Sequence, residues 1–332
     1  MELNVHVLVL ISVSILCLQP ADCISKLGNE NDRLALLEFK SQIEIGNDPN
    51  GIFSSWNDSV SFCTWQGVTC GNKHQRVMSL KLNGLSLSGT ISPFVGNLSF
   101  LRYLNLGDNK FHGEIPQEVG RLFRLRYLNL VNNKFEGEIP VSISNCSELR
   151  KLGISENRLV GKIPAELSFL EKFDTLFLDS NNLTGEIPPS FGNLSSLEDF
   201  YVSFNNIGGN IPNELGKLKN LIYFTISANN LTGTVPLSFY NISSLAVFSA
   251  ALNQLEGSLP ANIGITLPNL QKFGIHGNFF DGTIPVSFTN ASQLDILDLS
   301  DNIFTGQVPI NLGDLKALQR LNLEHNFLGS NA

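Results

Sequence analysis

The sequence is poor in charge, in methionine and in long apolar runs. Only 16 % of its 332 residues are charged, two are methionine and five are histidine. The net charge is -8, and the chain lacks both blocks of five or six like charges and the basic stripe typical of proteins that bind DNA or RNA. We therefore expect no nucleic-acid partner.

Cysteine is also scarce, and the spacing of the cysteines limits which disulfides or metal sites they could form. The five positions are Cys17, Cys23, Cys63, Cys70 and Cys146. Two close cysteines in an exported chain most often form a disulfide, which favours a Cys63–Cys70 bond and a free thiol at Cys146. A zinc site is the alternative, but no second cysteine pair is present and His74 is an isolated candidate ligand. We expect no metal and no cofactor.

One strongly apolar run stands at the N-terminus. Residues 5–18 are apolar apart from one histidine and two serines, and Pro20 follows. A membrane span needs roughly 20 apolar residues, so this run is too short to cross a bilayer, but it fits a secretory signal peptide. We predict a signal peptide over residues 1–23, a secreted or cell-surface location, and no membrane span in this chain. Glu2 stands where signal peptides usually carry positive charge, so a buried N-terminal segment is the alternative.

Most of the remaining chain repeats itself with a period of 24 residues. One asparagine marks each copy, and we name these residues the ladder asparagines. They are Asn109, Asn133, Asn157, Asn181, Asn205, Asn229, Asn253, Asn278, Asn302 and Asn326, with a single 25-residue step before Asn278. Around each runs the pattern L-x-x-L-x-L-x-x-N-x-L-x-G-x-I-P. Such a period predicts a solenoid, in which one core continues through every repeat.

Each position of the pattern has a structural explanation. In repeat four, Leu152 and Ile154 are two residues apart, so both side chains leave the same face of a short strand. Stacked copies of this strand predict a parallel sheet with the leucines inside. A buried amide cannot remain unpaired, so we expect Asn157 to bond to turns of its own and the neighbouring repeat. The ladder asparagines are therefore predicted to be structural rather than catalytic.

The region before the repeats is predicted to form a cap. Asp32 is placed to N-cap a helix over residues 33–45, whose apolar face would cover the end of the core. Trp56 and Trp65 are expected to pack inside this cap. Leu85 replaces the ladder asparagine in the first copy, as a terminal repeat with one neighbour can tolerate. The predicted domains are the signal peptide 1–23, an N-terminal cap 24–76, and ten complete repeats plus a partial eleventh over 77–332.

These motifs together resemble the ectodomains of plant leucine-rich-repeat receptor-like kinases. The repeat L-x-G-x-I-P is similar to the extracellular repeat class specific to plants, and the segments 31–40, 56–57 and 62–70 (FCTWQGVTC) resemble the cap of these receptors. The resemblance covers residue 31 to the end and is strongest to the branch holding the bacterial elongation-factor-Tu receptor and the rice blight-resistance receptor. It implies an α/β repeat fold: a plant-type leucine-rich-repeat solenoid, with a curved parallel sheet on its concave face and an N-terminal helical cap.

The same resemblance implies an extracellular ligand-recognition module, in immune or developmental signalling. Its partner would be a peptide or protein, with a co-receptor that has a short leucine-rich-repeat ectodomain as a second partner. The glycine-rich loop, H-R-D and D-F-G motifs of kinases are missing, so the chain is predicted not to be an enzyme and to be truncated before the membrane helix and kinase.

Two other functions are weighed against this one. A secreted leucine-rich-repeat inhibitor of microbial cell-wall-degrading enzymes is the main alternative. Such inhibitors carry a cysteine-rich C-terminal cap, whereas no cysteine follows Cys146. A structural wall protein is less favoured, because no proline-rich tract is present.

Strand residues that alternate with the core leucines are expected to line the concave face, where only solubility and binding constrain them. In repeats five to seven these positions gather aromatic and acidic side chains, which favours an interface. The predicted ligand-binding residues are Phe177, Asp179, Asp199, Tyr201, Phe204 and Tyr223. A rival strip is Tyr103 and Tyr127 in repeats two and three, beside Lys110, Lys134 and Arg158.

Eight N-x-S/T sequons predict glycosylation. They are Asn57, Asn97, Asn145, Asn182, Asn193, Asn230, Asn241 and Asn290. Five of them recur in alternate repeats and are expected along one outer side of the solenoid, away from the strands. Asn182 and Asn230 follow the ladder asparagines of repeats five and seven, whereas the matching Asn206 is not in a sequon. This leaves an unglycosylated gap beside the predicted ligand-binding residues.

Overall fold

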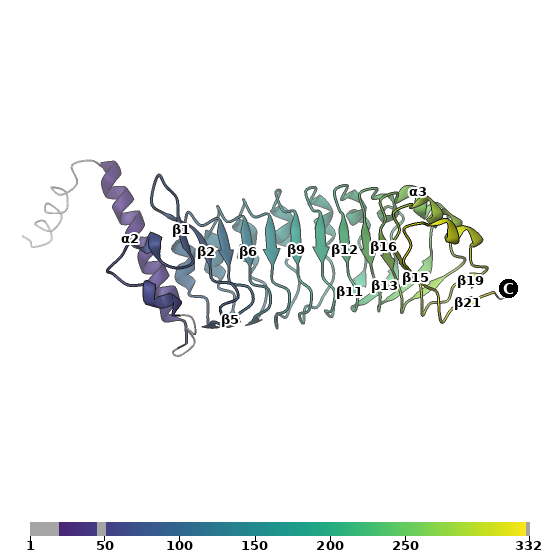
Figure 1. The fold of residues 1–332 in the computed structure, drawn as a ribbon, viewed down its shortest axis with the longest axis horizontal. Helices are drawn as coiled ribbons and strands as arrows, with labels where there is room; N and C mark the ends of the chain where they lie inside the picture. The colour runs from purple at the N-terminus through teal and green to yellow at the C-terminus, as the bar shows by residue number, and fades with distance from the viewer. Residues whose placement is uncertain (1–19, 45–50, 330–332) are drawn as a thin grey trace, which may run out of the picture.

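A computed structural model of the chain describes residues 20–44 and 51–329. They form an elongated solenoid with helix α2 (Pro20–Ser41) across its N-terminal end (Figure 1). The prediction of a plant-type leucine-rich-repeat solenoid with a helical cap is confirmed. Of the predicted signal peptide, residues 1–19 lie outside the described residues.

The main sheet receives one short strand from each repeat. Within the described residues it has twelve strands, and every neighbouring pair is parallel except β1 and β2. The strands are β1 Val68–Cys70, β2 Val77–Lys81, β4 Tyr103–Asn105, β6 Tyr127–Asn129, β8 Lys151–Gly153, β9 Thr175–Phe177, β10 Asp199–Tyr201, β12 Tyr223–Thr225, β14 Val247–Ser249, β16 Lys272–Gly274, β18 Ile296–Asp298 and β20 Arg320–Asn322. The parallel pairs keep one register, so equivalent residues of successive repeats form straight columns.

Smaller parallel sheets follow the ladder asparagines and run along the lower edge of the solenoid in Figure 1. We name this side the flank. Its strands are β3 Ser88–Gly89, β5 Lys110–Glu114, β7 Lys134–Glu136, β11 Gly208–Asn210, β13 Asn230–Thr234, β15 Gln254–Ser258, β17 Phe279–Asp281, β19 Thr305–Gly306 and β21 Phe327–Leu328.

Short helical turns return the chain on the side opposite the main sheet. In the repeats they are η3 Pro93–Asn97, η4 Gln117–Arg121, η5 Val141–Asn145, η6 Ala165–Phe169, η7 Pro189–Asn193, η8 Asn213–Lys217, η9 Phe239–Asn241, α3 Ile263–Thr266, η10 Val286–Asn290 and η11 Ile310–Asp314. The cap adds η1 Ile52–Ser55 and η2 Phe62–Thr64.

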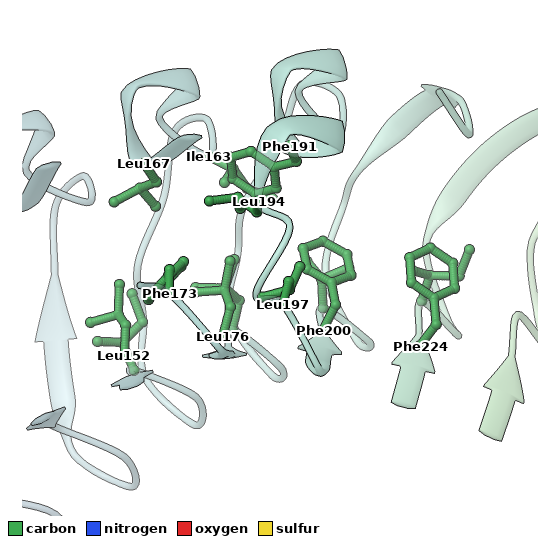
Figure 2. Close-up of a cluster of buried hydrophobic side chains, with 14 of the residues drawn as sticks. Leu152, Ile163, Leu167, Phe173, Leu176, Phe191, Leu194, Leu197, Phe200 and Phe224 are labelled. Carbon is green, nitrogen blue, oxygen red and sulfur yellow. The ribbon is translucent and has the colours of Figure 1, made fainter. Parts of the chain in front are cut away.

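The core lies between the main sheet and these turns. Figure 2 shows Leu152, Leu176, Phe200 and Phe224 from successive strands on one side of it, with Leu167 and Phe191 from the turns on the other. All six are at most 2 % exposed. Side chains on the open face of the main sheet, which is the side away from this core, therefore do not pack into the core.

The ladder asparagines bond as predicted. The side-chain amide of Asn157 donates to the carbonyls of Leu130 in the preceding repeat and of Ile154 and Ser155 in its own, at 3.0 to 3.1 Å. Its oxygen accepts the amide of Phe135 at 2.9 Å. Each ladder residue thus holds two consecutive repeats together, which fixes the columns in register.

The prediction that Asp32 begins a helix over residues 33–45 is wrong. Helix α2 starts at Pro20 and ends at Ser41, with Asp32 inside it. The fully buried Asp32 carboxylate instead accepts the Arg76 guanidinium at 2.7 and 2.9 Å and the Val77 amide at 2.8 Å. This ion pair ties the cap to the first strand of the repeats.

The two tryptophans of the cap pack as predicted. Trp56 and Trp65 are each 1 % exposed, and their rings stack with centroids 5.2 Å apart. They therefore contribute to the core rather than to a surface.

The cysteines of the cap and repeats have different environments. A disulfide joins Cys63 to Cys70, whose Cα atoms are 5.4 Å apart, and so links η2 to β1. Cys146 is buried and donates to the Val119 carbonyl at 3.3 Å. Burial raises the pKa of its thiol to about 12, so the thiol stays protonated and unreactive at neutral pH.

Candidate ligand-binding surface

The open face of the main sheet carries a group of aromatic rings in repeats five to seven. We define the aromatic patch as Phe177, Tyr201 and Tyr223, which extend from β9, β10 and β12. The rings of Phe177 and Tyr201 meet nearly edge to face, with centroids 4.9 Å apart and an interplanar angle of 71°. Tyr201 and Tyr223 stack at 6.3 Å. The structure thus brings these three predicted residues together on neighbouring strands.

Two predicted carboxylates border the aromatic patch. Asp179 accepts the Ser203 amide at 2.8 Å, yet burial outweighs this hydrogen bond and raises the pKa of its carboxyl to about 6. Asp199 accepts the Thr175 hydroxyl at 3.2 Å, and burial raises its pKa too. Burial also raises the pKa of Tyr201 to about 12, so its hydroxyl stays protonated. The patch is therefore apolar at its centre and weakly acidic at its border, with a charge that changes near pH 6.

Phe204 lies outside the strand column to which its spacing assigned it. Strand β10 ends at Tyr201, and Phe204 occupies the turn before the ladder residue Asn205. Its backbone φ is 56°, a left-handed conformation that Ser180 and Ala228 share in the neighbouring repeats. The side chain is 61 % exposed and makes no ring contact with the aromatic patch among the described residues. Phe204 is therefore a separate exposed ring at the rim of the open face.

The rival strip is divided between two surfaces. The rings of Tyr103 and Tyr127 stack on the open face, 4.2 Å apart and within 3° of parallel. Their predicted neighbours Lys110 and Lys134 instead begin the flank strands β5 and β7. The cation above Tyr103 is Lys81, whose ammonium lies 4.7 Å from the ring centroid.

Sequence reasoning missed the arginines beside these tyrosines. Arg102, Arg126 and Arg150 immediately precede β4, β6 and β8, and all three are exposed. The segment L-R-Y-L-N-L occurs twice, at 101–106 and 125–130, and such an exact recurrence of surface residues could have revealed them.

All eight sequon asparagines are exposed. Five of them end the turns η3, η5, η7, η9 and η10, opposite the main sheet. Asn182 and Asn230 directly follow the ladder residues Asn181 and Asn229, and Asn230 begins the flank strand β13. Asn206, between them, is exposed but not in a sequon.

Within the part of the chain that the structure describes, no helix has the length and apolarity needed to cross a bilayer. The same residues contain no group of three or more histidine, cysteine, aspartate or glutamate side chains arranged to hold a metal ion.

Two family descriptions match the chain. "Leucine-rich repeat region" matches residues 76–326, and "Leucine rich repeat N-terminal domain" matches residues 29–71. The matched regions are repeats and a cap, so this chain is a non-catalytic module.

Curated relatives are plant receptor kinases. The LRR receptor-like serine/threonine-protein kinase EFR of Arabidopsis thaliana is 55 % identical over 87 residues, which are 26 % of this chain and 8 % of EFR. Receptor kinase-like protein Xa21 of Oryza sativa subsp. japonica is 47 % identical over 89 residues, 25 % of this chain and 8 % of Xa21. The matched region is a small part of each relative's length.

Solved structures agree over most of the chain. PEPR1 in its complex with AtPEP1 superposes with a TM-score of 0.83 and 32 % identity, covering 90 % of this chain and 42 % of PEPR1. The plant peptide hormone receptor RGFR1, in complex with RGF2, superposes with a TM-score of 0.71 and 34 % identity, covering 73 % of this chain and 38 % of RGFR1. The chain belongs to the leucine-rich-repeat family, as a cap and repeat region similar to the ectodomains of plant receptor kinases.

Proposed function

We propose that this chain is the ligand-recognition module of a plant receptor-like kinase in immune or developmental signalling. It acts on the extracellular side of the plasma membrane and binds a peptide or protein on its concave face. The aromatic patch carries this proposal. Its three rings lie on a face that has a complete core of its own beneath, so packing does not require them there. Exposed aromatic clusters are typical of binding hot spots.

Similarity to known receptors supports a peptide as the ligand. RGFR1 is described as a plant peptide hormone receptor, and its structure shares this fold at 34 % identity. PEPR1 in its complex with AtPEP1 superposes over nine-tenths of this chain. A co-receptor with a short leucine-rich-repeat ectodomain stays a prediction of the resemblance.

The sequon pattern supports the same surface. Sugars on Asn182 and Asn230 would cover the flank of repeats five and seven, while Asn206 leaves repeat six clear. A ligand that reaches the aromatic patch by passing Asn206 in repeat six would meet no glycan.

The test uses peptides selected from a random 12-residue phage library on the glycosylated ectodomain. Tyr201→Ser should weaken their binding at least about tenfold, because removing a hot-spot ring costs about 2 kcal/mol or more. Phe279→Ser is the matched control, since it removes a ring that is 55 % exposed on the flank of repeat nine. Unchanged affinity for Tyr201→Ser, with an intact circular dichroism spectrum, would place the site elsewhere.

A second variant closes the unglycosylated gap. Gly208→Thr turns Asn206-Ile207-Gly208 into a sequon, and the nearest atom to a Cβ at this position is 3.6 Å away, an ordinary contact. Gly208→Val adds a side chain of the same shape without the sequon. We expect Gly208→Thr, once glycosylated, to block the selected peptides and Gly208→Val to bind them normally. Equal binding by both would show that ligands do not cross this rim.

A further inference from the structure

A row of residues marks the edge at which the main strands begin, and its charge changes sign along the solenoid. In chain order the row is Arg102, Arg126, Arg150, Asp174, Glu198 and Ile222. The amide of each residue after the first donates to the carbonyl of the one before, at 2.8 to 3.0 Å. Neighbouring members are therefore about 4.8 Å apart at the backbone. We name Arg102, Arg126 and Arg150 the arginine row.

The arginine row has no carboxylate partner of its own. None of its three members forms an ion pair with any residue in 20–44 or 51–329. The charges of Arg126 and Arg150 help to lower the pKa of Glu148, but the ion pair of Glu148 is with Lys172, at 2.5 Å. Three adjacent like charges repel one another, so an anionic partner would be favoured at this edge.

Two adjoining depressions lie beside the arginine row, and Arg102 lines both of them. One, of about 300 Å³, is lined by Arg102, Phe123, Arg124, Arg126, Ser147 and Glu148. The other, of about 280 Å³, includes Arg102 again, with Lys73, Arg76 and Phe100. Arg102 thus lies between two concave sites whose walls are mainly cationic and aromatic.

Two further guanidinium groups in these walls are held in place. The Arg76 and Arg124 guanidinium carbons lie 4.6 and 4.2 Å from the centroid of the Phe100 ring. Arg124 also donates to the Ser99 carbonyl at 3.2 Å, and Arg76 is fixed by its pair with Asp32. Groups already ordered lose less conformational entropy when a ligand binds.

We propose that the arginine row binds an acidic segment of a peptide ligand and that the reversal at Asp174 fixes the peptide's direction. The acidic segment lies toward the cap, and a neutral or basic segment continues over the aromatic patch. This inference rests on the proposed peptide-receptor function. Guanidinium groups bind carboxylates through paired hydrogen bonds. Three members at this spacing span about 10 Å, the length of about three residues of extended chain.

The sign change favours a peptide over a uniform polyanion. A long polyanion that follows the row would meet Asp174 and Glu198 after Arg150, and like-charge contacts across an interface are unfavourable. Lys151, which lies 4.0 Å from Asp174, marks the boundary between the two signs. A peptide can change its charge from residue to residue, as this surface does.

The first experiment measures binding of fluorescein-labelled hexaglutamate by anisotropy at low salt. The triple variant Arg102→Gln, Arg126→Gln, Arg150→Gln should bind at least about tenfold more weakly than the wild type, because each charge-assisted hydrogen bond contributes more than a neutral one. Lys110→Gln, Lys134→Gln, Arg158→Gln is the matched control: it removes the same charge from the same repeats, on the flank. The control should stay within about twofold of the wild type. Equal losses in both variants, or no saturable binding by the wild type, would overturn the proposal.

The second experiment tests direction with a peptide of three glutamates, a glycine and three lysines. A photoreactive group at its acidic end should cross-link to repeats two to four, and one at its basic end to repeats five to seven. The reverse pattern, or labelling of both regions by either end, would overturn the inferred direction.

The two proposals fail separately. If Tyr201→Ser abolishes binding of library-selected peptides while the arginine variant leaves hexaglutamate binding unchanged, the charge order is wrong and the receptor proposal stands. If Tyr201→Ser leaves binding of the selected peptides unchanged while the arginine variant loses hexaglutamate binding, the aromatic patch is rejected as the site and the arginine row stands.

Discussion

On the open face of the main sheet, the rings of Tyr103 and Tyr127 stack in parallel at 4.2 Å beside cations, whereas those of Phe177 and Tyr201 meet at 71° beside carboxylates. Both pairs lie on strands joined in the same parallel register. The ladder asparagines and the core decide where a side chain points, but they leave its chemistry free. The surface chemistry of the open face is therefore a property of its columns and is not determined by the fold.

The same two regions differ beneath the sheet. Leu104, Leu128 and Leu152 fill the equivalent core position in repeats two to four. In repeats six to nine this position holds a stack of phenylalanines, Phe200, Phe224, Phe248 and Phe273, with neighbouring centroids 5.1 to 6.0 Å apart. Aromatic stacks bury more area and add a favourable ring geometry. The segment beneath the aromatic patch and beyond it should be the more stable part of the solenoid.

The largest expected effect comes from removing one ring of this stack. Phe224→Ala should lower the free energy of unfolding by about 4 kcal/mol and Leu128→Ala by about 3 kcal/mol, since both side chains are at most 1 % exposed. Urea unfolding followed by circular dichroism measures both. A loss for Leu128→Ala as large as that for Phe224→Ala would erase the proposed difference between the two core regions.

Breaking the cap should affect the N-terminal region selectively. The double variant Cys63→Ser, Cys70→Ser should lose about 2–3 kcal/mol by the chain-entropy model. Hydrogen-exchange protection should fall in β1, β2 and repeats two to four, and stay unchanged in repeats five to seven, because each repeat contacts only its neighbours. Peptide mapping without reduction checks the bond itself. Alkylation of Cys63 in unreduced protein, or a uniform loss of protection, would contradict this prediction.

Removing the ladder amide between repeats four and five should weaken the hydrogen bonds that join the two regions. Asn181 donates to the Ile154 carbonyl of repeat four at 3.0 Å and accepts the Leu159 amide at 3.0 Å. Asn181→Ala strands these groups and should cost about 1–3 kcal/mol. Asn182→Ala, one residue on and exposed, is the control and should change the unfolding midpoint little in unglycosylated protein. Similar shifts in both variants would show that the ladder bonds contribute no net stability.

The periodic features of the molecule were predictable because their causes are local. The pattern of leucine, asparagine and glycine within 24 residues determines the strand, its buried face and the turn. The bonds of Asn157 to its own and the preceding repeat follow from the same spacing. Once the repeat is recognised, the columns of the open face follow with it, which is why Phe177, Tyr201 and Tyr223 could be placed together.

The remaining features depend on contacts that local sequence does not encode. Asp32 looked like a helix start, but its partner Arg76 is 44 residues away and the pair forms only in the folded cap. Strand β10 ends at Tyr201, three residues before Phe204. The alternation between core and open-face side chains therefore stops before Phe204. Lys110 and Lys134 follow the ladder turn and leave the open face for the flank. The errors at Phe204, Lys110 and Lys134 concern where a column ends, which is set by turn geometry rather than by hydrophobic periodicity.

The smallest expected effect concerns Asp179, one of the two carboxylates that border the aromatic patch. Asp179 stands in a column where repeats two and three have Gly107 and Val131. Burial raises the pKa of its carboxyl from 3.8 to about 6, so the folded state holds this proton more tightly than the unfolded state. The contribution to stability is present in full below about pH 4 and is lost as the pH rises through 6. Asp179→Asn has no such proton, and its amide oxygen can still accept the Ser203 amide.

We therefore expect Asp179→Asn to be more stable than the wild type at pH 7 by about 1 kcal/mol, a value discounted for the partial exposure of the group. The difference should shrink toward zero near pH 4, where the wild-type carboxyl is protonated in both states. Urea midpoints at pH 4, 5, 6 and 7 measure it. A difference that is the same at pH 4 and pH 7 would assign the effect to packing and remove the pH dependence proposed for the border of the aromatic patch.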